Sequence, residues 1–343
     1  MRLGSLFDGI GGWQLAAIRA GINPVWSAEI EKFPLKVTKK HFPETKQLGD
    51  VRQINGGEIP EVEIICAGSP CQDLSIAGKR EGLKGNASSL FFEATRIIRE
   101  MRKSSVGKYP RYFIWENVTG IFNSNSGLDF KRVLEELLET EIPMPEFKWA
   151  KAGMVEGRKC QLAWRTLDAQ YWGFPQRRKR IFLVADFTGR RAAEILFEFS
   201  DVSRNIETDG AEKTENPVTD KGEFEKTKCY GLGRDFYNQG IKAKFNLSIS
   251  ENVQPPLMAR GAGAVCTSQV IRRLTPLESE RLMGLPDNWT LIEDKNCSDA
   301  ARYKAVGNGM AQPIADWIIQ KIVEETQNFG SGRKCGLEQQ RGK

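Results

Sequence analysis

Residues 2–21 read RLGSLFDGIGGWQLAAIRAG, a short apolar run followed by a glycine-rich turn and an amphipathic stretch. The run from Arg2 to Phe7 is typical of a strand, and apolar residues recur at helical spacing from Trp13 to Gly21. The glycines between the two allow the backbone to come close to a ligand. The segment therefore predicts a strand, a tight turn and a helix, in that order.

The same alternation continues to residue 186. Further strands are predicted at residues 24–29, 63–68, 112–117 and 180–186, and helices at residues 32–41, 90–103 and 130–141. Strands that alternate with helices indicate an α/β fold with a doubly wound, mostly parallel sheet and helices on both faces.

The composition changes after residue 186. Residues 201–228 are rich in charged and polar residues, which predicts a mobile surface insertion. Residues 230–270 combine short polar strands with glycines, and a closing helix is predicted at 311–325. We therefore expect a first domain of residues 1–186 completed by residues 296–327, a second, smaller β-rich domain of residues 187–295, and a flexible tail of residues 328–343.

Bulk properties exclude several classes of protein. No apolar run reaches the roughly 20 residues of a membrane span, so no membrane association is expected. The seven scattered cysteines contain no Cys-x-x-Cys pair, which argues against a disulfide framework or a bound metal and favours the cytoplasm. The single histidine, His41, excludes a two-histidine zinc protease. A net charge of +6 is compatible with nucleic-acid binding and equally with a solvated surface.

Cys71 follows a predicted buried strand in the segment Gly68-Ser69-Pro70-Cys71-Gln72. Open α/β sheets bind ligands at this edge, where a cysteine can be exposed and react as the thiolate. A lone cysteine is more often a small buried hydrophobe. Here the following loop, residues 75–86, holds three glycines and three basic residues, a composition typical of a mobile lid that contacts phosphates.

Three more sets of polar residues lie at strand ends. Glu29 stands about 20 residues beyond the glycine turn, where an acid binds ribose hydroxyls in dinucleotide-binding folds. Glu116 ends a buried strand, and a carboxyl group there is costly unless it has a polar partner or ligand. Gln176, Arg178 and Arg180 occupy alternate positions leading into the last strand, which predicts donors aimed at one place.

Taken in order, these motifs resemble those of the cytosine-5 DNA methyltransferase family. Pro70-Cys71-Gln72 resembles its catalytic Pro-Cys dipeptide, Glu116-Asn117-Val118 its Glu-Asn-Val triplet, and Gln176-x-Arg178-x-Arg180 its Gln-x-Arg-x-Arg motif. The other matching motifs are Phe7-x-Gly9-x-Gly11-Gly12, Glu29-Ile30, Asp50-Val51, Arg273-Leu274-Thr275-Pro276 and Gly307-Asn308-Gly309. The chain departs from the pattern at Asp8, where small residues are common, and Gly309 is one of several residues accepted at its position.

The resemblance implies the S-adenosylmethionine-dependent methyltransferase fold, with the first domain binding the cofactor and the second recognising the target. It implies methyl transfer from S-adenosylmethionine to carbon 5 of a flipped-out cytosine in a specific duplex DNA sequence, through a covalent Cys71 adduct. Glu116, Arg180 and Arg178 would hold the base. The implied cofactor contacts are Phe7, Gly9, Ile10, Gly12, Glu29, Ile30, Asp50, Val51, Pro70, Leu90 and Asn308. The expected DNA contacts are Ser75, Lys79, Arg80, Gln176, Arg234 and Arg260.

Two alternatives remain open. A transfer-RNA cytosine-5 methyltransferase would share the motifs, although the Cys-Phe-Thr tripeptide of that branch is missing here. A non-catalytic DNA-binding homologue would carry degraded motifs, whereas Cys71 and Glu116 are intact. The motifs fit a restriction-partnered enzyme and an orphan or prophage enzyme alike. We expect a monomer acting on double-stranded DNA in a bacterial or phage-infected cell, with any cognate restriction endonuclease not in direct contact.

Overall fold

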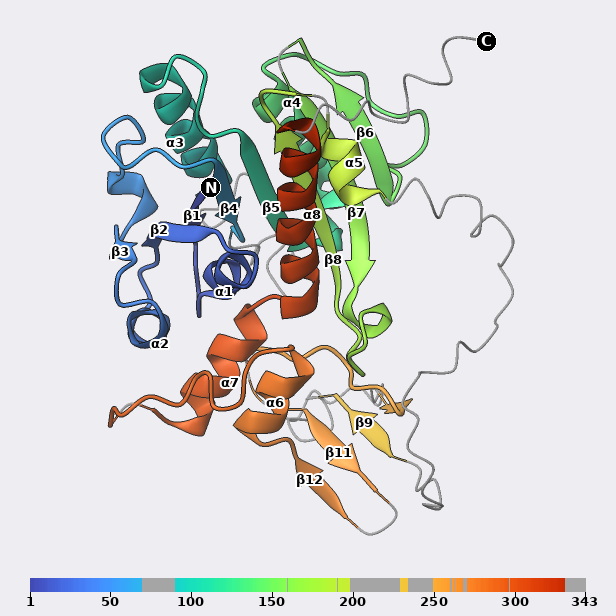
Figure 1. The fold of residues 1–343 in the computed structure, drawn as a ribbon. Helices are drawn as coiled ribbons and strands as arrows, with labels where there is room; N and C mark the ends of the chain where they lie inside the picture. Colours follow the sequence, from blue (N-terminus) through green and yellow to red (C-terminus); the bar gives the residue numbers. More distant parts are fainter. Residues whose placement is uncertain are drawn as a thin grey trace.

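A computed structural model describes residues 1–69, 90–158, 160–189, 191–197, 229–233, 249–259, 261, 263–267, 270–295 and 297–330. In this part of the chain one large sheet has the strand order β3-β2-β1-β4-β5-β8-β7-β6 (Figure 1). The strands are β1 (Arg2–Leu6), β2 (Asn23–Ala28), β3 (Lys46–Gln47), β4 (Ile64–Ala67), β5 (Tyr112–Val118), β6 (Ala152–Glu156), β7 (Gln161–Asp168) and β8 (Lys179–Asp186).

The sheet is parallel from β3 to β5 and antiparallel from there to its other edge. β1 pairs in parallel with both β2 and β4, and β4 pairs in parallel with β5. β8 then runs antiparallel to β5, and β7 and β6 continue antiparallel. The predicted mostly parallel sheet is confirmed, and the antiparallel pair β6–β7 was not predicted.

Helices cover both faces of the sheet. The helices are α1 (Gly12–Arg19), α2 (Lys32–His41), α3 (Leu90–Ser104), α4 (Leu128–Leu138), α5 (Ala192–Leu196) and α8 (Gln312–Gly330). Ile65 of β4 lies in a first apolar core with α3 and α4, and its neighbour Ile64 lies in a second core with α1, α5 and α8. Because successive strand residues point to opposite faces, the two cores lie on opposite sides of the sheet.

A small module lies beyond one end of the large sheet (Figure 1). We use this name for the antiparallel sheet β10-β9-β11-β12 together with α6 and α7. Its elements are β9 (Tyr230–Leu232), β10 (Ile249–Glu251), β11 (Ala264–Cys266), β12 (Ile271–Arg273), α6 (Pro276–Leu282) and α7 (Asp299–Asn308). A third apolar core joins Ile10 and Val37 of the large domain to Leu257, Met283 and Val306. The module therefore packs on the edge where the parallel strands end.

Short 3₁₀ turns complete the described chain: η1 (Val51–Gln53), η3 (Thr119–Phe122), η4 (Ser124–Gly127) and η5 (Ala169–Tyr171).

The packing differs from the predicted domain division in three places. α7 falls within residues 296–327, which were predicted to complete the first domain, yet Val306 packs with Leu257 and Met283 in the third core. α5 falls within the predicted second domain, yet Ile195 and Leu196 are buried in the second core beside α8. Residues 192–196 therefore pack on the large sheet, because their apolar side chains face it. α8 continues to Gly330, beyond the predicted start of the tail at residue 328. The predicted insertion, residues 201–228, lies outside the described residues.

Candidate active site and cofactor pocket

The glycine turn, residues 7–12, follows β1 at the edge where the parallel strands end. Phe7, Gly9 and Gly11 have φ angles of 54°, 57° and 81°, in the left-handed region. This backbone conformation costs free energy at a non-glycine residue such as Phe7, and such residues cluster at ligand sites. A Cβ atom built on Gly9 would meet no other atom within 4 Å. The turn therefore has open space beside its backbone.

Glu29 closes the turn from the end of β2. One of its carboxylate oxygens accepts a hydrogen bond from the Gly9 N–H at 2.8 Å. The other accepts from the N–H groups of Ile30 at 2.7 Å and Glu31 at 2.8 Å. The Ile30 side chain remains 62% exposed. A fixed carboxylate beside an exposed apolar side chain suits a nucleoside, with hydroxyls for the acid and a base for the apolar surface.

Three other predicted cofactor residues lie on neighbouring elements. Asp50 caps η1 by accepting a hydrogen bond from the Arg52 N–H, and it also forms an ion pair with the Arg52 guanidinium at 2.6 Å. The hydrogen bonds from Arg52 lower the pKa of this carboxyl group. Val51 is buried, and Leu90 is the half-buried first residue of α3.

The end of α7 returns to the glycine turn. A Cβ atom on Gly309 would lie 3.7 Å from the side chain of Ile10. The Gln312 side chain donates a hydrogen bond to the Gly12 carbonyl at 3.0 Å. Asn308, the last residue of α7, is exposed between these contacts. The first and last predicted cofactor motifs, about 300 residues apart, are thus adjacent in space.

Glu116, near the end of β5, and Arg180, near the start of the adjacent strand β8, form an ion pair. The Arg180 Nε lies 3.2 Å from the Glu116 Oε1, and the two side chains are 21% and 15% exposed. A Cβ atom on Gly68 would lie 3.7 Å from the Glu116 Oε2. The carboxylate therefore faces the end of β4.

The loop after β4 is held on β5 by the two residues that flank Glu116. The Ser69 Oγ accepts hydrogen bonds from the Trp115 Nε1 at 2.9 Å and from the Asn117 Nδ2 at 3.4 Å. Cys71 follows two residues later and lies outside the described residues. Because Ser69 is held against β5, the chain that carries Cys71 starts beside Glu116.

Gln176 and Arg178 do not join Arg180, so the predicted convergence of the three donors is wrong. Gln176 is fully buried and donates to the Leu282 carbonyl at 3.3 Å, which leaves it no surface for the predicted DNA contact in this structure. Arg178 is 2% exposed and donates to backbone carbonyls of the small module, among them that of Leu257 at 3.3 Å. The reason is that β8 begins only at Lys179, so strand alternation does not extend to residues 176–178.

A family model described as C-5 cytosine-specific DNA methylase matches residues 1–239 and 198–324. The chain belongs to this family. The predicted family and the predicted enzyme, a DNA cytosine-5 methyltransferase that uses S-adenosylmethionine, are thereby confirmed. The type II methyltransferase M.HhaI of Haemophilus parahaemolyticus is 27% identical, over 94% of this chain and 94% of its own length.

One further protein is similar to this methyltransferase in sequence, and one solved structure is similar in fold. A protein of Escherichia phage P1, named DNA N-6-adenine-methyltransferase, is 28% identical over 96% of this chain. The match spans only 62% of that longer protein. The crystal structure of Schizosaccharomyces pombe Dnmt2 superposes with a TM-score of 0.60 over 96% of this chain and 100% of its own, at 16% identity. That likeness shows a shared methyltransferase fold, as predicted.

Two buried cysteines of this methyltransferase are poor candidates for the nucleophile. Burial raises the pKa of the Cys66 thiol well above its usual range, and the nearby Asp8 adds to the effect. Burial also raises the pKa of Cys160 to about 11. Neither thiol ionises readily near pH 7. The predicted nucleophile Cys71 and the predicted contacts Pro70, Ser75, Lys79, Arg80, Arg234 and Arg260 lie outside the described residues and stay predictions.

Trp289 supports the glycine turn and was not singled out in the sequence. Its Nε1 donates to the Ile10 carbonyl at 2.9 Å, and its ring stacks on His41 at 3.7 Å between centroids. The His41 ring nitrogen Nε2 lies 2.7 Å from the Trp289 carbonyl oxygen. No local pattern could have revealed these contacts, because Ile10 and Trp289 are 279 residues apart.

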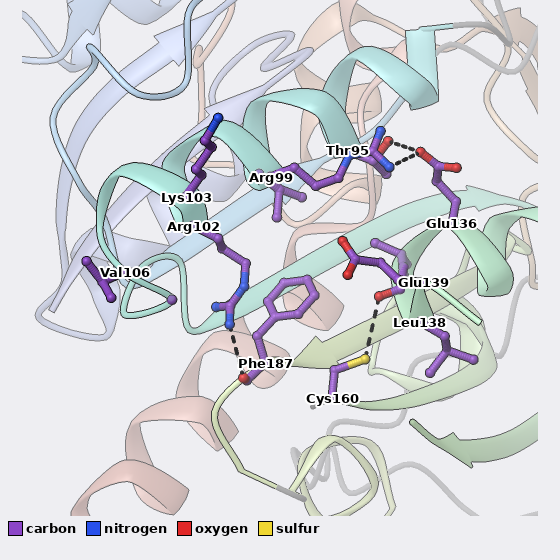
Figure 2. A pocket seen from close by; sticks show the side chains of 13 residues that line it. Thr95, Arg99, Arg102, Lys103, Val106, Glu136, Leu138, Glu139, Cys160 and Phe187 are labelled. Atoms are coloured by element: carbon purple, nitrogen blue, oxygen red, sulfur yellow. Dashed lines mark hydrogen bonds and ion pairs between the residues drawn. The ribbon is translucent and has the colours of Figure 1, made fainter. Parts of the chain in front are cut away.

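A separate cavity of about 500 Å³ lies between α3, the end of α4 and the residue after β8 (Figure 2). Arg99, Arg102, Glu136 and Cys160 line it, as does Phe187, which follows the end of β8 opposite to Arg180. It therefore belongs to neither the glycine turn nor the Glu116–Arg180 pair.

The described residues offer neither a cluster of metal ligands nor a membrane-spanning helix. No group of three or more His, Cys, Asp or Glu side chains there could hold a metal ion. No helix there is long and apolar enough to cross a membrane.

Proposed function

We propose that this methyltransferase acts on a cytosine flipped out of a specific duplex DNA sequence, through a covalent bond between the Cys71 sulfur and carbon 6. The observation that carries the proposal is the Glu116–Arg180 ion pair, which faces the end of β4 where the segment leading to Cys71 begins. A carboxyl group, a guanidinium and a thiol around one site can act on a single heterocyclic ring. A base stacked in a duplex cannot reach such a site, so it must leave the stack.

Each side chain has a defined task in the proposed reaction. The Cys71 thiolate forms a bond to carbon 6, and the ring electrons shift toward N3 and make carbon 5 nucleophilic. Glu116 holds N3 and the amino group and supplies a proton as negative charge builds there. Arg180 holds the ring carbonyl oxygen. After methylation a water molecule takes the proton from carbon 5, and the electron pair of that bond restores the carbon 5–carbon 6 double bond and expels the Cys71 thiolate. N3 returns its proton to Glu116.

The glycine turn and Glu29 fit S-adenosylmethionine, which supplies an electrophilic methyl group when bound. Open space beside Gly9 leaves room for the cofactor, and the Glu29 carboxylate is fixed at the turn. Exposed Ile30 offers an apolar surface for the adenine. We assign the remaining predicted contacts, Phe7, Ile10, Gly12, Asp50, Val51, Leu90 and Asn308, to the same pocket.

Target recognition is assigned to the small module, which packs beside the proposed site through the third core. Base edges are read by side chains and closely approaching backbone in the major groove. Arg234 and Arg260 remain the proposed contacts. The proposed enzyme is a monomer and acts in the cytoplasm. It needs no direct contact with a partner endonuclease.

The covalent step is tested with a duplex in which 5-fluorocytosine replaces the target cytosine. Fluorine cannot leave as the carbon-5 proton does, so the enzyme should remain attached to the DNA. Intact-protein mass spectrometry should show one covalent adduct for the wild type and none for Cys71→Ser. Cys229→Ser, at a half-exposed cysteine of the small module, should be trapped like the wild type. An adduct in Cys71→Ser would refute the role of Cys71.

The target base and the nucleic acid are tested separately. Nucleoside mass spectrometry of methylated DNA should show 5-methylcytosine and no N6-methyladenine, the product that the name of the phage P1 relative would suggest. Transfer RNA offered in parallel should accept far less methyl group than duplex DNA. Preferential methylation of transfer RNA would support the alternative substrate.

A further inference from the structure

Arg178 lies where the large sheet meets two parts of the small module, the end of α7 and the segment that holds Leu257. Its guanidinium donates hydrogen bonds to the Leu257 carbonyl at 3.3 Å, to the Gly307 carbonyl at 3.3 Å and to the Gly309 carbonyl. Its own N–H donates to the Asp168 carboxylate at 2.9 Å, which fixes the backbone from which the side chain starts. The side chain is 2% exposed, so it is held inside the protein, away from any base.

Two of these acceptors flank Asn308. Carbonyl groups in the last turn of a helix have no partner within the helix, and a cation there is also favoured by the helix dipole. Arg178 supplies both a donor and a positive charge at the end of α7. Because it binds the carbonyls of Gly307 and Gly309, it holds the backbone on either side of Asn308.

The third acceptor ties the same point to the small module. Leu257 belongs to the segment 254–259, and the backbone of that segment also exchanges hydrogen bonds with Pro175 and Arg177. A Cβ atom on Gly307 would lie 2.5 Å from backbone atoms of Met258 and Ala259. The end of α7 thus touches this segment directly, with no room for a side chain between them.

We propose that Arg178 is a positioning residue that fixes Asn308 in the cofactor pocket, rather than a residue that contacts the cytosine. The inference rests on the proposed function, since it takes Asn308 as a cofactor contact. It divides the Gln-x-Arg-x-Arg motif into two parts. Arg180 acts at the base, and Arg178 acts on the cofactor through the end of α7.

The test is a double-mutant cycle read by calorimetric binding of S-adenosylhomocysteine without DNA. Arg178→Ala should weaken binding roughly five- to tenfold, the lower part of the range for coupled sites. In an Asn308→Ala background the same change should weaken binding less than twofold, because its route to the cofactor is gone. Arg178→Lys should bind the cofactor more tightly than Arg178→Ala, because it keeps the positive charge. It should remain weaker than the wild type, because an ammonium reaches fewer of the carbonyls.

Two arginine controls give contrasting signatures. Arg177→Ala removes an exposed neighbour and should leave cofactor affinity unchanged. Arg180→Ala should also keep cofactor affinity but lose turnover. If Arg178→Ala does not fold, Gly307→Ala perturbs the same joint with Arg178 intact, and it should weaken cofactor binding too.

Three outcomes would overturn the inference, and they point to different causes. Additive effects of Arg178→Ala and Asn308→Ala would mean that Arg178 does not act through Asn308. Unchanged cofactor affinity with lost turnover in Arg178→Ala would place it at the base with Arg180. If Asn308→Ala left cofactor affinity unchanged, the proposed cofactor role of Asn308 would fail together with the inference. If Asn308→Ala weakened cofactor binding and Arg178→Ala did not, the inference would fail but the cofactor role of Asn308 would stand.

Discussion

Asp8 places a carboxyl group inside the glycine turn, where it is 5% exposed. Its Oδ2 accepts a hydrogen bond from the Gln14 Nε2 at 2.5 Å. The pKa of this carboxyl group is raised to about 7, mainly by burial and in smaller part by the nearby Glu29, against hydrogen bonds from Ser5 and Gln14 that lower it. A buried group of this kind prefers its neutral form. Ionisation of the Asp8 carboxyl group therefore destabilises the folded protein.

Asp8→Asn should stabilise the protein more at pH 8 than at pH 5. In the unfolded chain Asp8 releases its proton near pH 4, whereas in the folded chain it does so near pH 7. The wild type therefore loses stability as pH rises between these values, and asparagine does not. The gain in the free energy of unfolding should grow by roughly 2–3 kcal/mol between pH 5 and pH 8. Urea unfolding at both pH values measures it.

Asp50→Asn is the matched control for this change. Hydrogen bonds from Arg52 lower the pKa of Asp50, so its carboxylate is ionised in both folded and unfolded chains above pH 5. Its effect on unfolding should therefore be the same at pH 5 and pH 8. A gain for Asp8→Asn that does not depend on pH would show that Asp8 titrates normally in the folded protein.

At the scale of elements, two ion pairs of the small module differ sharply in burial. Arg302 in α7 and Glu280 in α6 are 2.9 Å apart, with side chains 9% and 0% exposed. Arg281 and Asp287 are only 2.5 Å apart, but their side chains are 59% and 52% exposed. Removing one partner of a buried pair leaves an uncompensated charge, whereas water solvates an exposed one. Burial rather than distance should therefore decide the cost.

Glu280→Gln should destabilise the protein by roughly 3 kcal/mol, because the Arg302 charge stays buried without its carboxylate. The Thr290 N–H, which donates to the Glu280 Oε1 at 2.9 Å, can donate to the glutamine oxygen instead, so the change isolates the loss of charge. Asp287→Asn, the exposed counterpart, should cost less than about 1 kcal/mol. Chemical denaturation of both variants gives the comparison. Equal costs would mean that Glu280 does not stabilise α6 against α7 through charge.

Sequence periodicity predicted those elements in which the buried residues are apolar and recur at regular spacing. α3 buries Phe91, Ala94, Ile97, Ile98 and Met101 at helical spacing, and it was predicted to within one residue. β7 was missed because it buries polar residues, including Gln161, whose side chain accepts from the Ala193 N–H at 3.0 Å. A partner 32 residues away is invisible to a local pattern.

The same limit explains the candidate site. Glu29 and Glu116 were predicted from their place at strand ends, because the sheet itself fixes where those ends lie. Arg178 was misplaced because its acceptors, Gly307 and Gly309, lie about 130 residues further along the chain. The end of a strand can be predicted from neighbouring residues, whereas a hydrogen-bond partner far along the chain cannot.

At the scale of the whole molecule, we expect target choice to depend on residues 230–270 and not on residues 201–228. The latter are mostly charged and polar, with few groups to offset the entropy of ordering. Deleting residues 201–228 should leave the methylated DNA sequence unchanged, and Arg260→Ala should weaken or relax it. Methylation sequencing of a plasmid carried by the expressing cells reads both. A changed target in the deletion together with an unchanged one in Arg260→Ala would reverse the assignment.

The closure of the glycine turn by Trp289 and Gln312 also sets the order of events during synthesis. A ribosome makes Ile10 and Gly12 first and their partners about 300 residues later, on the order of half a minute at typical rates of elongation. Until then the nascent chain exposes the apolar side of its turn and lacks the end of α7. A ribosome-stalled chain that stops at residue 280 should therefore fail to retain S-adenosylmethionine on a filter, whereas the released full-length chain should retain it. An interrupted message would then yield an inert fragment, and not an enzyme that methylates DNA.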